Sequence, residues 1–465
     1  MRTIAIIGGG ITGISTAYYL EKQLAETGQQ VKIVLIEREE KLGGKINTQQ
    51  EASFLMEVGA DSIVARKQNV APLLEELNLA DEVVYNTVGV SYLYNADGLK
   101  RIPPDTIFGI PMTVQSLAES ELISDQGKVA ALKDIYTPNE KFTAQDSIGH
   151  FLKHFFGEEL VDKQIAPVLS GVYSGNIYEL TLANTLPYLL EYKNTYGSII
   201  KGLEQHKAQF QQANNKKFIS FANGLDRLPN KMAQQLKQTE ILQGIAAEHI
   251  TKQHSLHDSY VITLSNGETI NADYVILSTL HTVAQQLLQD EQLDTLFSQL
   301  KTSSLISMYL GYALPDATLP ADGTGFIVAG NSALTCNACT WTSRKWEHTS
   351  AEQRLLLRLF YKSNSTAFEK LCQMDEQAQL QFAKQEIKAS LKIIADPVEF
   401  VVTKWTDTMP NYHLQHPQIV KQLEQSLQEN YPGMLLAGCS YYGVGIPDCI
   451  QNGEQTAKKI IELLR

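Results

Sequence analysis

The chain has 465 residues, of which 43% are hydrophobic, and its formal net charge is −12. This length predicts two or three domains with substantial cores. An acidic chain without a basic block argues against nucleic acid as a partner, and because no apolar run is long enough to span a membrane, we expect no integral membrane segment.

A strand, a glycine-rich turn and a helix are the first predicted elements. Residues 3–7 have the β-branched content of a buried parallel strand, and residues 11–27 carry apolar side chains at helical spacing. Gly8, Gly10 and Gly13 lie between them as GxGxxG. These glycines permit the tight bend, the approach of a pyrophosphate and the packing of helix on strand. A dinucleotide site is therefore favoured over a glycine turn without ligand.

An acidic residue after the second strand supports this interpretation. Residues 31–36 form the predicted strand, and Glu37 follows it at Rossmann spacing. A carboxylate there can accept hydrogen bonds from ribose hydroxyls, and its charge disfavours a 2′-phosphate. Gly43 and Gly44 then precede Lys45, which offers a positive charge to a diphosphate, although a solvated loop would tolerate the same residues.

The dinucleotide fold is next interrupted and then resumed. Residues 111–199 look mostly helical and predict a helical subdomain. The fold resumes at residues 221–236, a strand end with an amphipathic helix, and at residues 259–279, a hairpin followed by a buried strand. This organisation predicts a sheet assembled from separate parts of the chain.

A second interruption precedes the last strand of that sheet. Residues 304–361 have strand patterns and residues 375–394 have helical spacing, which predicts an antiparallel sheet facing the cofactor. Residues 434–437 supply the last parallel strand, and a glycine turn leads into a helix over residues 448–464. The N-terminus of this helix would point at the cofactor.

These patterns divide the chain into three predicted domains. They are a discontinuous cofactor-binding domain of residues 1–65, 218–285 and 431–465, a substrate-binding domain of residues 66–110, 200–217 and 286–430, and a helical subdomain of residues 111–199.

The five cysteines predict reduced thiols in the cytoplasm, because their number is odd and the chain shows no export signal. Cys336 and Cys339 form one CxxC, but neither a second pair nor a nearby histidine pair completes a four-ligand set. We therefore expect no metal site.

Several motifs together resemble those of the Gram-positive-type coproporphyrinogen III and protoporphyrinogen oxidases, which are FAD-dependent members of the amine-oxidase-like superfamily. The motifs span nearly the whole chain, and GVGIPDCI from Gly443 is the most discriminating. The others are GGGITG from Gly8, GADSIVARK from Gly59, LSGVYSGNI from Leu169, GTGFIV from Gly323, CTWTSRKWEHT from Cys339 and TMPNYH from Thr408.

The resemblance implies an α/β fold and a cofactor. We expect a Rossmann-like FAD-binding domain of the amine-oxidase and p-hydroxybenzoate-hydroxylase type, with an α+β substrate domain and a helical subdomain. FAD would be bound non-covalently. The candidate cofactor-binding residues are Gly8, Gly10, Ile11, Gly13, Glu37, Arg38, Gly43, Gly44, Lys45, Gly59, Ala60, Asp61, Ser62, Ala247, Gly445 and Ile446.

The resemblance also implies the activity and its substrate. The implied activity is the oxidation of coproporphyrinogen III to coproporphyrin III in heme biosynthesis. Molecular oxygen would be the acceptor and hydrogen peroxide a product, and a ferrochelatase would receive the porphyrin. No residue is assigned a catalytic role, since the hydride would pass directly to the flavin. The candidate substrate-binding residues are Arg66, Lys67, Arg101, Arg344 and Phe360, and Lys345 and Arg358 are further cations.

Three alternatives stay open from the sequence. A protoporphyrinogen IX oxidase would share these motifs. An FAD-dependent amine oxidase would share the fold and bind a cation between aromatic rings. A non-enzymatic carrier built on the same fold would dispense with FAD, whereas this chain keeps both glycine segments and Glu37.

Overall fold

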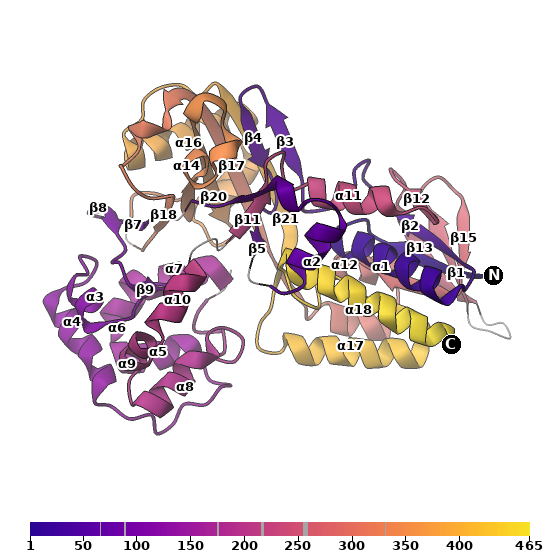
Figure 1. Cartoon of the computed structure of the whole chain (residues 1–465), viewed down its shortest axis with the longest axis horizontal. Coiled ribbons are helices and arrows are strands. Elements are labelled where there is room, and N and C mark those ends of the chain that lie inside the picture. The colour runs from indigo at the N-terminus through magenta and orange to yellow at the C-terminus, as the bar shows by residue number, and fades with distance from the viewer. Residues whose placement is uncertain (66, 88–89, 174–175, 215–217, 254–258, 331) are drawn as a thin grey trace.

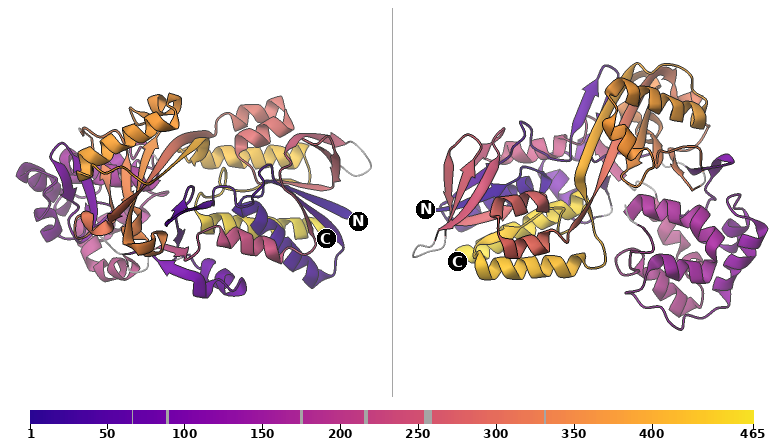
Figure 2. Two further views of the ribbon diagram at one scale, coloured as in Figure 1. Left: turned by 90° about the horizontal axis from the view of Figure 1, so that it is seen from above. Right: turned by 180° about the vertical axis from the view of Figure 1, so that it is seen from behind.

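Two β-sheets and a group of helices form the main parts of the molecule (Figure 1). The computed structural model describes residues 1–465 except 66, 88–89, 174–175, 215–217, 254–258 and 331. The helical group lies at the opposite end of the molecule from both chain ends, as the views in Figures 1 and 2 agree. The predicted α/β fold class is confirmed, and the domain boundaries stay a prediction.

The first sheet is parallel throughout, in the order β12-β2-β1-β16-β22. Each strand is a short apolar run, as expected where both faces of a parallel sheet are covered. The strands are β1 (Arg2–Ile7), β2 (Val31–Ile36), β12 (Thr239–Leu242), β16 (Tyr274–Leu277) and β22 (Met434–Leu436).

Helices α1 (Ile11–Thr27) and α18 (Ile446–Leu464) pack together on one face of this sheet. Gly453 allows their close approach, because a Cβ atom there would lie 2.6 Å from Ser15 Cβ. The other face is covered by α12 (His281–Leu288), α13 (Glu291–Phe297), α17 (His416–Asn430) and a small antiparallel sheet of β13 (Ala247–Gln253), β14 (Ser259–Leu264) and β15 (Thr269–Ala272).

The second sheet has the order β21-β17-β20-β19-β18-β7-β8 and is antiparallel except where β18 meets β7. Apolar side chains on one face pack against α15 (Phe368–Gln373) and α16 (Glu376–Leu391). The strands are β7 (Ser91–Asn95), β8 (Gly98–Arg101), β17 (Lys301–Pro315), β18 (Gly325–Val328), β19 (Ala338–Trp341), β20 (Arg354–Lys362) and β21 (Glu399–Asn411).

The helical group packs around a core rich in phenylalanine, including Phe151, Phe155 and Phe156. Ile200 and Leu203 belong to the same core. Its helices are α3 (Val114–Ala118), α4 (Asp125–Ala131), α5 (Ile148–Phe156), α6 (Glu158–Leu160), the π-helix η3 (Val161–Ile165), α7 (Ala166–Tyr173), α8 (Pro187–Tyr196), α9 (Ile199–Gln205) and α10 (Lys207–Asn214).

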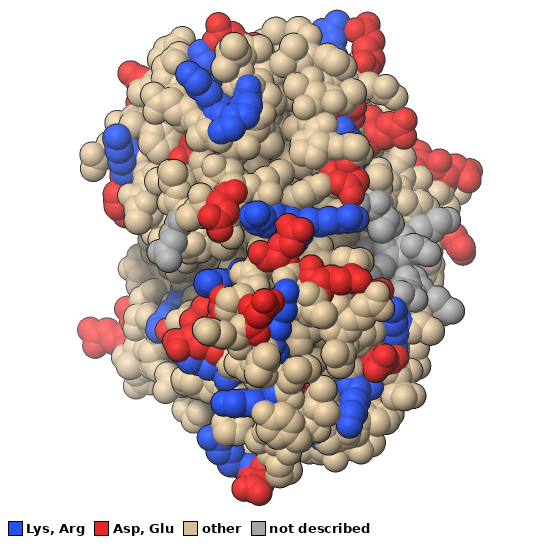
Figure 3. Space-filling model, turned by 90° about the vertical axis from the view of Figure 1, so that its left-hand side faces the viewer, with Lys and Arg blue, Asp and Glu red and all other residues tan. Residues whose placement is uncertain are grey.

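Short elements connect these parts. They are β3 (Thr48–Glu51), β4 (Phe54–Glu57), β5 (Ile63–Val64), α2 (Val70–Glu76), β6 (Val83–Tyr85), β9 (Thr106–Ile107), β10 (Ile110–Pro111), β11 (Phe218–Phe221), α11 (Arg227–Gln235) and α14 (Thr342–Lys345). Of the helices in the described residues, none combines the length and apolarity needed to cross a bilayer. On the face shown in Figure 3, basic and acidic side chains are interspersed.

Candidate functional site

The glycine-rich turn after β1 has the geometry of an anion site. Gly8 has a φ of 105°, and a Cβ on Gly13 would lie only 1.9 Å from the Gly8 carbonyl oxygen. Gly10, by contrast, faces open space, because a Cβ there would meet no atom within 4 Å. The backbone is therefore open on that side, directly before α1 begins at Ile11. This arrangement fits a diphosphate at the helix N-terminus.

The second glycine pair docks on this turn. Gly10 and Gly43 form an isolated parallel bridge, and the Gly43 N–H donates to the Gly9 carbonyl (2.9 Å). Gly44 has a φ of 59°, which favours glycine. The structure therefore brings the two predicted glycine segments together.

Glu37 is buried at the carboxyl end of β2 and faces the same turn. Its Oε2 atom accepts from the Gly9 N–H (2.6 Å), and its Oε1 atom accepts from the Glu39 N–H (2.9 Å). The Ile245 N–H donates to the Glu37 carbonyl (3.1 Å), two residues before Ala247 opens β13. Arg38 instead points to solvent and pairs with Glu39 (3.0 Å).

Lys45 joins the second glycine segment to two distant segments. Its ammonium donates to the Thr408 carbonyl and lies 3.6 Å from Cys439 Sγ. Tyr412 Oη continues this connection, since it donates to the Cys439 carbonyl (2.7 Å) and accepts from the Gly443 N–H (2.6 Å). The turn that leads to Gly445 and Ile446 at the start of α18 is thus fixed beside Lys45.

The loop that carries Gly59, Ala60, Asp61 and Ser62 is held by the seven-stranded sheet. Three side chains from β17, β20 and β21 donate to its carbonyl oxygens. These bonds join Tyr309 Oη to Glu57 O (3.2 Å), Trp405 Nε1 to Val58 O (3.0 Å), and Arg358 Nη2 to Val58 O and Gly59 O (3.2 and 3.1 Å). At Gly59 a Cβ would lie 2.0 Å from the Lys45 carbonyl oxygen, so the loop also packs closely on the second glycine segment.

Asp61, which belongs to this loop, forms an ion pair with Lys345. Its Oδ2 atom lies 2.7 Å from Lys345 Nζ, and Ser62 Oγ donates to Oδ1 (2.8 Å). Burial alone would raise the pKa of Asp61, but the charges of Lys345 and Arg358 and the hydrogen bond from Ser62 together outweigh burial, so the pKa lies below its usual range. Asp61 is therefore ionised at neutral pH.

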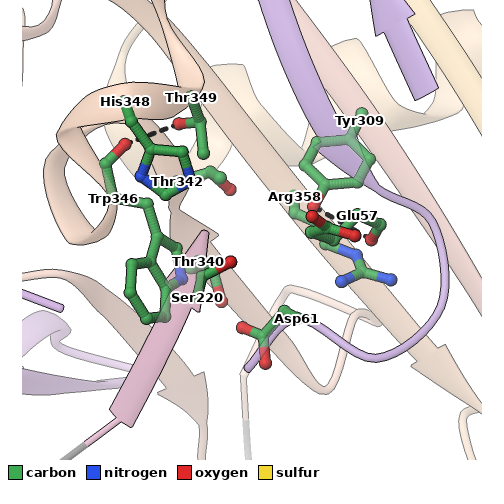
Figure 4. Close-up of a pocket in the computed structure, with 10 residues that line it drawn as sticks. All are labelled: Glu57, Asp61, Ser220, Tyr309, Thr340, Thr342, Trp346, His348, Thr349 and Arg358. Atoms are coloured by element: carbon green, nitrogen blue, oxygen red, sulfur yellow. Dashed lines mark hydrogen bonds between the residues drawn. The ribbon is translucent and has the colours of Figure 1, made fainter. Parts of the chain in front are cut away.

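A small cavity lies between this loop and the sheet (Figure 4). Its volume of about 10 Å³ has room for about one water molecule. Burial raises the pKa of Glu57 to about 7 and lowers that of His348 to about 4. The lining residues are Glu57, Asp61, Ser220, Tyr309, Thr340, Thr342, Trp346, His348, Thr349 and Arg358. Within the part of the chain that the structure describes, five buried side-chain atoms of this lining have no hydrogen-bond partner, namely Ser220 Oγ, Thr342 Oγ1, Trp346 Nε1, His348 Nε2 and Arg358 Nε.

Those candidate substrate residues that the structure describes do not form one cluster of free cations. Lys67 Nζ pairs with Asp448 Oδ1 (2.8 Å), and Arg101 pairs with Asp322 (3.3 Å). The Arg344 guanidinium donates to the carbonyls of Pro320 (2.9 Å) and Asp316 (2.8 Å). Phe360 lies beside Arg358, whose guanidinium carbon is 4.7 Å from the centre of its ring. Arg66 lies outside the described residues.

Sequence reasoning assigned no role to Trp405, Tyr309 or Tyr412. Tyr412 belongs to the TMPNYH motif. The position of this motif before the last strand was the sequence signal that could have indicated a role for Tyr412. Tyr309 and Trp405 belong to no recognisable motif. Their contacts with residues 57 and 58 could not be predicted, because these contacts depend on how the two sheets are arranged.

The fold and this site define a flavin-dependent oxidoreductase. The family model for flavin containing amine oxidoreductases matches residues 11–461, and the chain belongs to this family. The family indicates a flavin cofactor, and the open backbone at Gly10 beside the buried Glu37 carboxylate fits a dinucleotide form of it.

Within the family, the chain is similar to the coproporphyrinogen III oxidase of Bacillus subtilis, with 32% identity over 100% of this chain and 98% of that protein. The coproporphyrinogen III oxidase of Staphylococcus aureus is 28% identical over 99% of both chains. A crystal structure from Exiguobacterium sp. 255-15, provisionally assigned as a protoporphyrinogen oxidase, has a TM-score of 0.89 and 28% identity over 100% of this chain and 99% of that one.

Proposed function

We propose that this chain uses FAD to oxidise coproporphyrinogen III to coproporphyrin III, with molecular oxygen as acceptor and hydrogen peroxide as product. The observation that carries the proposal is the full-length similarity to coproporphyrinogen III oxidases, at 32% identity for the Bacillus subtilis protein. Each two-electron oxidation would reduce one oxygen molecule to one peroxide, and three of them convert the porphyrinogen to the porphyrin. The product would pass to a ferrochelatase in the cytoplasm, within heme biosynthesis.

FAD would be held by segments from both ends of the chain. In this proposal Gly8, Gly10 and Gly13 receive the diphosphate, and Glu37 accepts hydrogen bonds from the adenosine ribose. The loop at Gly59 would support the flavin ring, which supplies two-electron oxidation when bound. The remaining proposed contacts are Ile11, Arg38, Gly43, Gly44, Lys45, Ala60, Asp61, Ser62, Ala247, Gly445 and Ile446.

The attachment of FAD is proposed to be non-covalent. Cys449 is buried, and burial raises the pKa of its thiol to about 12. A thiol that stays protonated at neutral pH is a poor nucleophile. Cys439 lies nearer the surface, and its Sγ atom is beside the Lys45 ammonium (3.6 Å).

The protein's proposed contribution to the chemistry is to orient the macrocycle against the flavin. The clamped loop at residues 57–59 would keep the ring system in place, and apolar side chains such as Phe360 would exclude water. Lys67 would bind a substrate carboxylate in place of Asp448, since the Lys67 ammonium is partly exposed. Arg66, Arg101 and Arg344 stay candidates for other carboxylates.

The test is the oxygen-dependent appearance of porphyrin fluorescence from purified protein with FAD and no detergent. Coproporphyrinogen III and protoporphyrinogen IX are compared at equal concentration, and hydrogen peroxide is measured in the same samples. We expect faster oxidation of coproporphyrinogen III, with about three peroxides for each porphyrin. If neither is oxidised faster than the enzyme-free control while FAD stays bound, the substrate assignment is wrong, and amines are tested next.

Protoporphyrinogen IX is the second candidate substrate. The chain is 25% identical to the protoporphyrinogen oxidase of Bos taurus over 99% of this chain and 98% of that protein. Because protoporphyrinogen IX has two carboxylates and coproporphyrinogen III has four, the two candidates differ in how many cations they need. Faster oxidation of protoporphyrinogen IX in the same assay would favour this second candidate.

A further inference from the structure

One face of the seven-stranded sheet meets the cofactor-binding part of the chain. Alternate residues of β20 point to opposite faces, so Arg358, Phe360 and Lys362 share a face. This is the face that meets the loop at residues 57–59, because Arg358 donates to the Gly59 carbonyl (3.1 Å). Leu359 and Tyr361 instead belong to the core under α15 and α16. Lys362 is therefore on the face of the clamped loop.

The strand register confirms this placement of Lys362. Lys362 is opposite Leu305 of β17, and Leu305 is opposite Trp405 of β21. Trp405 Nε1 donates to the Val58 carbonyl (3.0 Å), so this row of the sheet also faces the loop at residues 57–59. Residues in one row of antiparallel strands share a face.

The Lys362 ammonium lies where the sheet meets the helical group. It is half-buried and donates to the carbonyl of Ser170 in α7 (3.0 Å). Burial lowers the pKa of Lys362. Among the described residues, no salt bridge joins this ammonium to a carboxylate.

The other cations considered for substrate binding, apart from Arg66, which lies outside the described residues, have protein partners. Lys67 pairs with Asp448, Arg101 with Asp322 and Lys345 with Asp61. Arg344 donates to backbone carbonyls and lies 3.5 Å from Asp316, and Arg358 donates to the carbonyls of the clamped loop. Lys362 is thus an ammonium removed from much of the solvent and without a counter-ion in the described part of the chain, an arrangement that a bound carboxylate would stabilise.

We propose that Lys362 binds a carboxylate of the substrate at the junction of β20 and α7. Phe360 lies two residues before it on the same face, about 7 Å along the strand, and would contact the macrocycle that carries the carboxylate. The inference rests on the proposed function, because it requires a substrate with an apolar ring and acidic side groups.

The test uses the FAD-loaded full chain with Lys362→Met, Lys362→Gln and Lys362→Arg. Lys404→Met is the matched control, since Lys404 is an exposed lysine of the same sheet whose ammonium also contacts a backbone carbonyl, that of Cys372 (3.4 Å). Binding of coproporphyrin III is measured by quenching of its fluorescence at several salt concentrations. Steady-state oxidation of coproporphyrinogen III gives KM and kcat for the same variants.

We expect Lys362→Met and Lys362→Gln to weaken coproporphyrin binding roughly 10-fold and to raise KM with little change in kcat. The salt dependence of binding should become shallower, while Lys362→Arg and Lys404→Met should bind like the wild type. Flavin absorbance and thermal melting check that each variant is folded.

Two results would overturn the inference in different ways. If the wild type binds and oxidises the tetrapyrrole and both neutral variants at position 362 bind it equally well, Lys362 is not a carboxylate site and the proposed function stands. If the wild type neither binds coproporphyrin III nor oxidises coproporphyrinogen III, the proposed function falls, and this inference falls with it.

Discussion

Glu57 is a carboxyl group that the fold keeps out of water. Its side chain accepts from the Leu225 N–H (2.7 Å) and from Thr48 Oγ1 (2.9 Å), and burial still raises its pKa from 4.5 to about 7. A raised pKa means that the folded chain binds this proton more tightly than the unfolded chain does. Glu57 therefore favours folding at low pH, and this contribution is lost as the pH rises from about 4.5 to about 7.

We expect Glu57→Gln to remove this pH dependence. Between pH 4.5 and 7, the wild type should lose about 3 kcal/mol of unfolding free energy relative to the variant, because the amide cannot ionise and can keep the acceptor role toward Leu225. Urea unfolding at several pH values measures the difference. Parallel pH profiles of the two proteins would show that Glu57 titrates normally.

At the scale of single elements, Arg358 joins β20 to the loop after β4. The guanidinium is buried and donates to two loop carbonyls and to Ser307 Oγ (3.3 Å). Hydrogen bonds from a charged donor contribute about 1.5–3 kcal/mol. The loop at residues 57–59 thus depends on a side chain about 300 residues later in the chain.

We expect Arg358→Leu to loosen this loop. Hydrogen–deuterium exchange of the peptide that covers residues 57–62 should be at least about 10-fold faster in the variant, since the Gly59 carbonyl loses its charged donor and the Val58 carbonyl keeps only Trp405. Arg354→Leu is the control, because Arg354 lies in the same strand but pairs at the surface with Glu352 (2.7 Å). Equal exchange in Arg358→Leu and wild type would mean that Tyr309 and Trp405 hold the loop without the arginine.

The sequence predicted elements better than the contacts between them. The parallel strands β1, β2, β16 and β22 were predictable, because continuous apolar runs beside glycine turns identify buried strands. The spacing of the motif alone predicted that Glu37 would lie near the glycine turn, where its carboxylate accepts from the Gly9 N–H. The bond from Lys45 to Thr408 was not predictable, since it depends on how two distant parts of the chain pack. The role of Lys362 likewise required the register of β20 against its neighbours.

At the scale of the whole molecule, the proposed FAD site draws on segments near both chain ends. A ligand that binds only the folded state stabilises it by an amount set by its concentration relative to its Kd. We expect FAD at 100 times its Kd to raise the unfolding free energy of flavin-free protein by about 2.7 kcal/mol. Riboflavin, which lacks the diphosphate and adenosine, should raise it less.

Thermal melting of the flavin-free protein at increasing FAD concentration is the measurement. The melting temperature should rise continuously with FAD and much less with riboflavin at the same concentrations. Equal shifts with the two compounds would contradict a dinucleotide site at Gly10 and Glu37.

The arrangement of the parallel sheet also has a consequence for synthesis of the chain on the ribosome. β1 and α1 are made early, but β22 and α18, which complete their sheet and cover α1, are made only after the entire seven-stranded sheet. Until then the part of α1 that packs against α18 has no permanent cover, and transiently exposed apolar surface promotes aggregation. Chaperones that shield nascent chains are therefore expected to associate with this protein throughout most of its translation.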